Sequence, residues 1–156
     1  RLVPDMLALR NQIPSHVELV VKVHPTTEII DEEKLSVVEG IELIKKEQSA
    51  DDILLAADCL ITDYSSVAFD YALINPKGKL IFYWFDEEQY NQETGIQDIF
   101  KNTLPYEVCQ TIAEVTEAIE SDVEDLSAFN QVWNTYNDGN AQERLLEKIK
   151  KKMDGE

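Results

Sequence analysis

The sequence predicts an α/β fold in which a parallel sheet is sandwiched between helices. Short apolar runs rich in β-branched residues alternate with segments of helical periodicity. The runs are apolar at successive positions, which is typical of parallel strands covered on both faces. The sequence contains no internal repeat, low-complexity tract or linker. These observations indicate one α/β domain over residues 1–156.

The amino-terminal third predicts a helix end, two strands and a further helix. Residues 6–12 have the pattern of a helix that closes before Pro14. Residues 18–23 are mostly apolar and β-branched, which predicts a strand, and residues 40–44 predict a shorter one. Ser49 is expected to cap the helix that follows.

The middle of the chain predicts two strands joined through a helix. Residues 59–62 form a short apolar run, and residues 66–73 have helical spacing. Residues 75–78 combine asparagine, proline and glycine, which predicts a turn, and residues 79–83 are again a near-continuous apolar run. This order is expected of a strand–helix–strand unit.

The carboxyl-terminal part predicts mainly helices. Residues 91–102 are expected to be an irregular loop, and residues 106–109 a last short strand. Three helices are expected to follow, over residues 111–121 (capped by Thr111), over 127–136, and from 140 onward with Leu145, Leu146 and Ile149 inward.

The chain is strongly acidic, with 14 Lys and Arg against 31 Asp and Glu and a formal net charge of −17. This charge argues against a nucleic-acid surface, which requires a basic face. It also means that a phosphate site would depend on local donors, because the overall field repels anions. Cys59 and Cys109 lack metal-ligand or redox spacing, so we expect reduced thiols in a cytoplasmic protein.

The candidate site follows the strand predicted at 59–62. Thr62, Asp63, Ser65 and Ser66 form a hydroxyl-rich turn between that strand and the next helix. Ligands of open parallel sheets bind outside the carboxyl ends of strands, and a helix amino terminus favours anions. The turn therefore predicts a phosphate site. The alternative is that these residues only cap the helix.

Two further residues are expected near this sheet edge. His24 stands at the carboxyl end of the strand predicted at 18–23, and the side chain of Lys22 leaves the same face. The alternative for His24 is a loop histidine that packs on Pro25. The other histidine, His16, is expected at the surface.

Asp70 follows Ser66 by four residues, so both would lie on one helix face about a turn apart. A carboxylate there could accept the two ribose hydroxyls of a nucleotide, or it could be a solvated acid. The sequence has no glycine-rich phosphate loop and no nucleophile-elbow context, and its acidic positions do not predict a metal site.

Several of these segments resemble the CDP-glycerol glycerophosphotransferase family, which includes the teichoic acid primases and polymerases. The resemblance is carried by Val-Lys-Val-His-Pro at 21–25 and by Ala-Asp-Cys-Leu-Ile-Thr-Asp-Tyr-Ser-Ser-Val-Ala-Phe-Asp-Tyr-Ala at 57–72. Leu-Ile-Phe-Tyr at 80–83, Asp86, and Asn-Asp-Gly-Asn-Ala-Gln-Glu-Arg at 137–144 extend it. Lys-Asn-Thr-Leu-Pro-Tyr at 101–106 departs from the family pattern.

The resemblance implies a two-domain GT-B fold, of which this chain would be the carboxyl-terminal, Rossmann-like, nucleotide-binding half. It implies a CDP-glycerol or related CDP-polyol donor and a lipid-linked hydroxyl acceptor, with no cofactor, for an enzyme peripheral to the cytoplasmic face of the membrane. Ser65, Ser66 and Lys22 would hold phosphate, Asp70 the ribose, and His24 would be catalytic. As one half of such an enzyme, the chain alone is expected to be inactive.

Two other functions remain open. Related GT-B proteins include sugar-nucleotide transferases and UDP-sugar epimerases, which hold a ribose at the place that Asp70 matches. A non-catalytic regulatory α/β module of the receiver type would need an acidic pair after an early strand. Residues 23–25 offer none.

Overall fold

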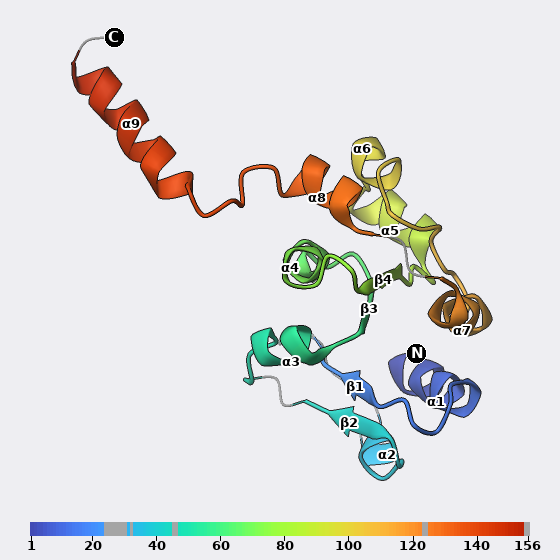
Figure 1. The fold of residues 1–156 in the computed structure, drawn as a ribbon. Helices are drawn as coiled ribbons and strands as arrows, with labels where there is room; N and C mark the ends of the chain where they lie inside the picture. Colours follow the sequence, from blue (N-terminus) through green and yellow to red (C-terminus); the bar gives the residue numbers. More distant parts are fainter. Residues whose placement is uncertain (24–30, 32, 45–46, 123–124, 155–156) are drawn as a thin grey trace.

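The computed structural model describes residues 1–23, 31, 33–44, 47–122 and 125–154, and it has a mixed α/β architecture (Figure 1). Helices flank short parallel strands, and from α3 to β4 the order of elements matches the predicted alternation. The elements are α1 (Leu2–Gln12), β1 (Leu19–Val21), α2 (Glu33–Ser36), β2 (Ile41–Leu43), α3 (Asp51–Ala56), β3 (Cys59–Thr62), α4 (Val67–Ile74), β4 (Lys79–Phe82), α5 (Glu87–Glu93), α6 (Asp98–Lys101), α7 (Ile112–Glu120), α8 (Ser127–Trp133) and α9 (Ala141–Met153).

The strands pair in parallel, as predicted. In one pair Leu19 of β1 is in register with Ile41 of β2, and in the other Cys59 of β3 is in register with Lys79 of β4. Within the described ranges these are two separate two-stranded pieces, whereas the sequence predicted one continuous sheet. β1 and β2 are also shorter than predicted, and Val20 is exposed, so this piece is not covered on both faces.

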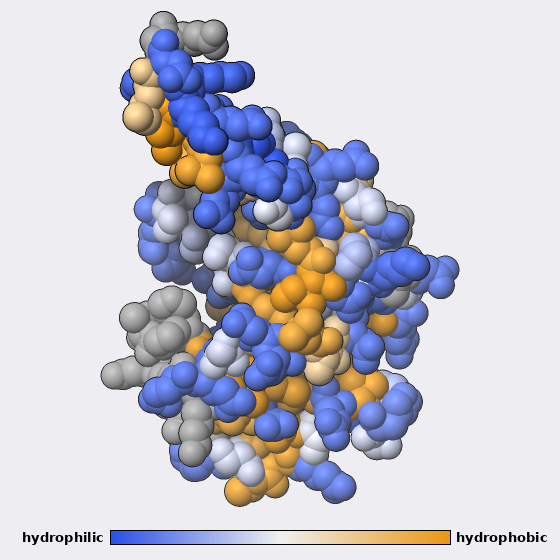
Figure 2. Space-filling view, turned by 60° about the vertical axis from the view of Figure 1, so that its left-hand side comes forward, coloured by the Kyte–Doolittle hydropathy of each residue, from blue (hydrophilic) through white to orange (hydrophobic). Residues whose placement is uncertain are grey.

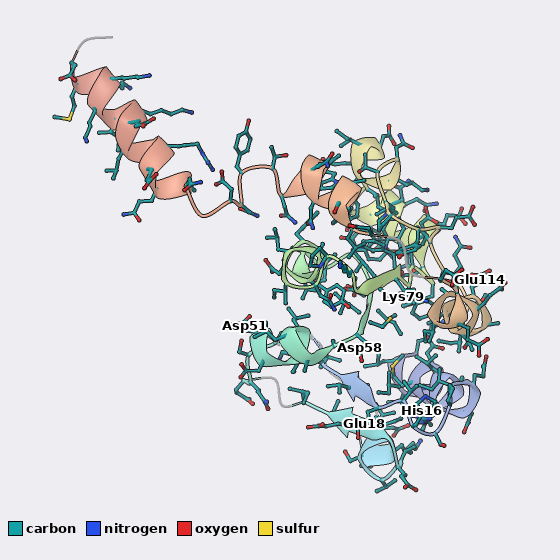
Figure 3. The ribbon with its side chains drawn as sticks, viewed as in Figure 1. His16, Glu18, Asp51, Asp58, Lys79 and Glu114 are labelled. Carbon is teal, nitrogen blue, oxygen red and sulfur yellow. The ribbon has the colours of Figure 1, made fainter. Side chains whose placement is uncertain are left out.

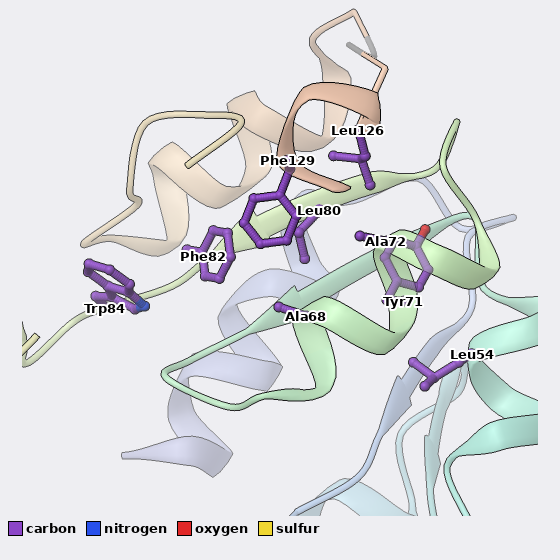
Figure 4. Packing of buried hydrophobic residues seen from close by; sticks show 9 residues of the cluster. All are labelled: Leu54, Ala68, Tyr71, Ala72, Leu80, Phe82, Trp84, Leu126 and Phe129. Carbon is purple, nitrogen blue, oxygen red and sulfur yellow. The ribbon is translucent and has the colours of Figure 1, made fainter. Parts of the chain in front are cut away.

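β4 forms the middle layer, because its alternating side chains enter two different apolar clusters. Leu80 and Phe82 pack with Trp84 against α4 and α8 (Figure 4). Ile81 and Tyr83 face the opposite side, where residues of α1 and α7 cover them. All four residues of β4 are buried, which confirms the prediction of a strand covered on both faces.

The second cluster also joins the two pieces of sheet. Leu19 of β1 packs against it together with Cys59 and Ile61 of β3. Cys59 and Cys109 both belong to this layer and are free thiols. Burial raises the pKa of the Cys59 thiol to about 12 and also raises the pKa of Cys109, so both stay protonated near neutral pH.

The predicted turn between α4 and β4 is present and depends on a glycine. The amide of Gly78 donates to the carbonyl oxygen of Asn75 at 2.9 Å. A Cβ atom at Gly78 would lie 2.3 Å from the Tyr71 hydroxyl and 2.5 Å from Nδ2 of Asn75. Both groups donate to the carbonyl oxygen of Ala57 at 3.2 Å, so only glycine leaves room for this contact between α4 and the start of β3.

Helix capping agrees with the sequence at one helix and differs in detail at another. At α7, Thr111 and Glu114 form a complete capping box, which confirms the predicted Thr111 cap. At α3 the residue in the capping position is Ala50, although the Ser49 hydroxyl accepts a hydrogen bond from the Asp51 amide at 3.2 Å.

Two predictions for the segment after β4 were wrong. Residues 91–102, expected to be an irregular loop, contain the end of α5 and all of α6. The strand expected at 106–109 is reduced to one bridge, in which Cys109 pairs in parallel with Tyr83. Phe100 of α6 packs on the apolar cluster around Phe82.

The predicted terminal helix, α9, is present, but its apolar face is not turned inward. Leu145, Leu146 and Ile149 are 58%, 49% and 45% exposed. The helix projects from the rest of the chain, and apolar side chains are visible along it (Figures 1 and 2). The 3.6-residue pattern correctly identified an apolar face, but nothing in the described part of the chain covers it. No helix in that part is long and apolar enough to span a bilayer.

Candidate functional site

The predicted site lies in the turn between β3 and α4. Oδ1 of Asp63 accepts a hydrogen bond from the Ser65 amide at 3.1 Å, and Oγ of Ser65 accepts one from the Val67 amide at 3.3 Å. Ser66 occupies the capping position of α4 without a capping hydrogen bond from its side chain. Ser65 therefore caps the helix, and the turn is closed by its own side chains.

The first amides of α4 already have acceptors within the turn. The Ala68 amide donates to the Ser65 carbonyl oxygen at 3.4 Å, and the Phe69 amide donates to the Ser66 carbonyl oxygen at 3.0 Å. Val67 donates to the Ser65 hydroxyl. The exposed hydroxyl groups of Ser65 and Ser66 are therefore side-chain donors that this turn offers to an anion.

Two aromatic residues attach the turn to the core. Nε1 of Trp84 donates to the carbonyl oxygen of Asp63 at 3.1 Å. The Tyr64 hydroxyl donates to Oδ1 of Asp86 at 3.0 Å. The Tyr64 ring stacks on Trp84 with centroids 5.1 Å apart and on Tyr90 with centroids 3.5 Å apart. Residues after β3 and after β4 are thereby held together at the carboxyl ends of these strands.

Burial raises the pKa of Tyr64, and its hydrogen bond to Asp86 raises it further. The hydroxyl therefore remains neutral and continues to donate across the whole physiological range.

Asp70 lies one helical turn beyond Ser66, and both residues are exposed. The opposite face of α4 carries the buried residues Ala68, Tyr71 and Ala72. The amphipathic division of α4 thus leaves Ser66 and Asp70 on its solvent face. The role of Asp70 in binding ribose stays a prediction, beside the alternative of a solvated acid.

The remaining residues singled out from the sequence lie in the amino-terminal part of the chain. Lys22 is half-buried directly after β1. His24 lies outside the described residues, so its proximity to the Ser65–Ser66 turn stays a prediction. His16 is exposed beside β1, as expected (Figure 3). Among the described residues, no group of three or more His, Cys, Asp or Glu side chains is arranged to hold a metal ion.

An open hollow of about 480 Å³ lies beside α5 and α6. Lys101 and Glu87 form an ion pair in its wall. The hydrogen bond from Lys101, a second one from Gln110 and the charge of Lys101 lower the pKa of Glu87. None of the site residues predicted from the sequence lines this hollow, and its walls are Glu87, Lys101, Leu104, Pro105, Tyr106, Glu107 and Val108.

Lys79 has a structural role that the sequence did not reveal. It was predicted only as the start of an apolar strand, but its ammonium group is buried and donates to the carbonyl oxygens of Ala118 and Ile119, each at 2.7 Å. It also donates to the carbonyl oxygen of Ser121. Lys79 therefore caps the carboxyl end of α7 from the first residue of β4 (Figure 3).

Sequence reasoning also missed Trp84 and the Tyr64–Asp86 pair as supports of the turn. A signal was available for Trp84, because a buried indole N–H usually finds an acceptor. The sequence did not indicate which acceptor, since Trp84 and Asp63 are 21 positions apart.

The sequence profile described as CDP-glycerol:poly(glycerophosphate) glycerophosphotransferase matches residues 2–151. The chain is 30% identical over 142 residues to a teichoic acid glycerol-phosphate primase of Bacillus subtilis (strain 168), covering 88% of this chain and 36% of the relative. It is 35% identical over 102 residues to a teichoic acid ribitol-phosphate primase of Bacillus spizizenii (strain ATCC 23059 / NRRL B-14472 / W23), covering 63% of this chain and 26% of the relative.

A teichoic acid glycerol-phosphate transferase of Staphylococcus aureus (strain NCTC 8325 / PS 47) is 26% identical over 154 residues, which are 93% of this chain and 38% of that protein. The chain thus spans little more than a third of the length of these relatives at most.

Proposed function

The chain belongs to the CDP-glycerol:poly(glycerophosphate) glycerophosphotransferase family, and on this premise we propose that it is the donor-binding part of a teichoic acid polyol-phosphate transferase. The donor is CDP-glycerol or a related CDP-polyol, and the acceptor is a hydroxyl group on a lipid-linked chain. In this proposal the domain is the carboxyl-terminal half of a GT-B enzyme that works at the cytoplasmic face of the membrane.

The observation that carries this proposal is the exposed pair of hydroxyls in the turn between β3 and α4. This turn stands at the carboxyl end of a strand in a parallel pair, where such folds bind ligands. Ser65 and Ser66 supply two adjacent donors, and Asp70 lies one turn further along the same exposed face. Phosphate oxygens at the serines would leave the ribose hydroxyls within reach of Asp70.

Charge makes local donors necessary. The chain carries a formal net charge of −17, and Asp63 adds a carboxylate inside the turn itself. A diphosphate would therefore be held by the serine hydroxyls and by a cation such as Lys22. The neutral serine hydroxyls can hold phosphate oxygens when their positions are fixed, because their dipoles need no reorganisation when charge develops.

The reaction we propose is a substitution at phosphorus. The acceptor hydroxyl oxygen attacks the β-phosphorus of the CDP-linked donor, a new P–O bond forms, and the bond to the bridging oxygen breaks so that CMP leaves. His24 would take the acceptor proton as a general base or, when protonated, would stabilise the phosphate charge. Positioning and preorganised donors supply most of the rate enhancement in such transfers.

We also propose that the chain alone does not catalyse transfer. It corresponds to little more than a third of its relatives, and a GT-B active site lies in the cleft between two halves. A half-site open to water loses the strengthening of electrostatic contacts that closure provides.

A ribitol donor is the second candidate. The ribitol-phosphate primase of Bacillus spizizenii is 35% identical to this chain over 102 residues, a higher identity over a shorter match than that of the glycerol-phosphate primase.

Release of labelled CMP from CDP-glycerol or CDP-ribitol, in the presence of a lipid-linked acceptor, tests the proposal. In the longest natural form of the protein that carries this chain, His24→Ala should lower the rate by about 100-fold or more. His16→Ala is the matched control and should have little effect. Release at the rate of the longer protein by residues 1–156 alone would refute the need for a second half, and an active His24→Ala variant would refute the role of His24.

A further inference from the structure

We infer that Trp84 is a positioning residue that holds the Ser65–Ser66 turn in its ligand-binding conformation. The effect on ligand binding rests on the proposed function. The hydrogen bond from Trp84 to the turn is a feature of the fold itself. Trp84 does not contact the proposed ligand. It would act through the backbone of Asp63.

Trp84 is suited to this role because it is immobilised on several sides. The residue is fully buried, and its amide donates to the carbonyl oxygen of Cys109 at 2.8 Å. Its ring meets Phe82 edge to face with centroids 5.8 Å apart (Figure 4). It also packs near Phe100, with ring centroids 6.3 Å apart. An indole fixed in this way presents its N–H in one direction only.

A chain of hydrogen bonds runs from that N–H to the serine hydroxyl. Nε1 of Trp84 donates to the Asp63 carbonyl oxygen, which fixes the plane of the peptide that follows Asp63. The Asp63 carboxylate then accepts from the Ser65 amide, and Oγ of Ser65 accepts from the Val67 amide. Because Oγ is held as an acceptor on one side, the hydroxyl proton must point elsewhere, and Ser65 is exposed.

Tyr64 provides a second attachment of the same turn. Its ring stacks on Trp84 and on Tyr90, and its hydroxyl donates to Asp86 at 3.0 Å. Asp63 and Tyr64 are thus tied to the segment after β4, while Ser65 and Ser66 remain exposed. Holding a short polar turn in one conformation before binding reduces the entropy lost when the ligand arrives.

Trp84→Phe tests the inference, because it removes the indole N–H and keeps an aromatic ring. Trp133→Phe is the matched control: Nε1 of Trp133 donates to Oγ1 of Thr103 at 2.9 Å, and its ring packs on the same apolar cluster. The readouts are amide hydrogen exchange at Ser65 and Val67, urea unfolding, and binding of CDP, inorganic pyrophosphate and cytidine by the chain.

We expect Trp84→Phe to speed hydrogen exchange at the amides of Ser65 and Val67. It should also weaken the binding of CDP and of pyrophosphate by a similar factor, about three- to tenfold. Cytidine binding should not change. Trp133→Phe should lower the stability to urea and leave amide exchange in the turn and ligand binding unchanged. Unchanged exchange at Ser65 and Val67 in Trp84→Phe would overturn the inference. If Trp84→Phe does not fold, hydrogen exchange of the Trp84 indole N–H is measured in the wild-type chain, and rapid exchange of that proton overturns the inference as well.

The exchange readout decides the inference without any nucleotide. If the wild-type chain fails to bind CDP, the proposed function is contradicted while the exchange comparison still gives its answer. If CDP binds and Trp84→Phe leaves both affinity and exchange unchanged, the proposed function survives and the positioning role fails.

Discussion

The carboxylate of Asp63 accepts a hydrogen bond from the Ser65 amide at 3.1 Å, so an acidic side chain lies inside the turn where we propose that phosphate binds. A carboxylate repels a diphosphate, but this one also fixes the backbone that presents Ser65 and Ser66. The two effects can be separated, because asparagine retains the acceptor oxygen without the charge.

Asp63→Ala should therefore weaken CDP binding by about three- to tenfold, since the turn loses its internal acceptor. Asp63→Asn should bind CDP at least as well as the wild type. Calorimetric titration of both variants measures the difference. Equal losses in the two variants would show that the charge itself is required.

The serine hydroxyls are predicted to be the donors for phosphate. Ser65→Ala combined with Ser66→Ala should weaken CDP binding by about 1–3 kcal/mol, because two hydroxyl donors are lost. Both residues are exposed, so urea unfolding should change little. Ser15→Ala, at an exposed position before β1, is the control. An unchanged affinity in the double variant would exclude these residues from the site.

Asp70 is predicted to accept the ribose hydroxyls. Asp70→Asn should lower the affinity for CDP and leave the affinity for inorganic pyrophosphate almost unchanged, since pyrophosphate has no ribose. Asp51→Asn, an exposed acid at the start of α3, controls for the loss of one negative charge (Figure 3). Equal effects on both ligands would indicate a defect of helix α4, and no effect would indicate a solvated acid.

Local features of the site were predictable from the sequence. The strand at Cys59–Thr62, the turn and the helix that follows Ser66 were all expected, because apolar runs and capping residues act over a few positions. The capping box at Thr111 and Glu114 was predictable for the same reason.

Contacts between distant positions were not predictable. The bond from Trp84 to Asp63 spans 21 positions, and the bond from Lys79 to Ala118 spans 39. Periodicity identifies the apolar face of an element but not what covers it. For that reason α9 was predicted correctly as a helix and wrongly as having Leu145 inward.

Lys79 is predicted to stabilise the fold through α7. Lys79→Met should lower the free energy of unfolding by about 1–3 kcal/mol, because the carbonyl groups at the end of α7 lose a charged donor in a buried setting. Lys77→Met, an exposed change two residues earlier, should have little effect. Thermal or urea unfolding of the two variants decides this, and equal stability would show that water replaces the ammonium group.

The most direct test of the donor-binding role is a calorimetric titration of residues 1–156 with CDP and, separately, with UDP. A turn that holds a diphosphate in a CDP-polyol transferase predicts saturable binding of CDP, weaker binding of UDP, and loss of the CDP signal in the Ser65→Ala/Ser66→Ala variant. Absence of CDP binding would contradict the account. Binding of UDP as tight as that of CDP would contradict the cytidine donor and favour a sugar-nucleotide enzyme instead.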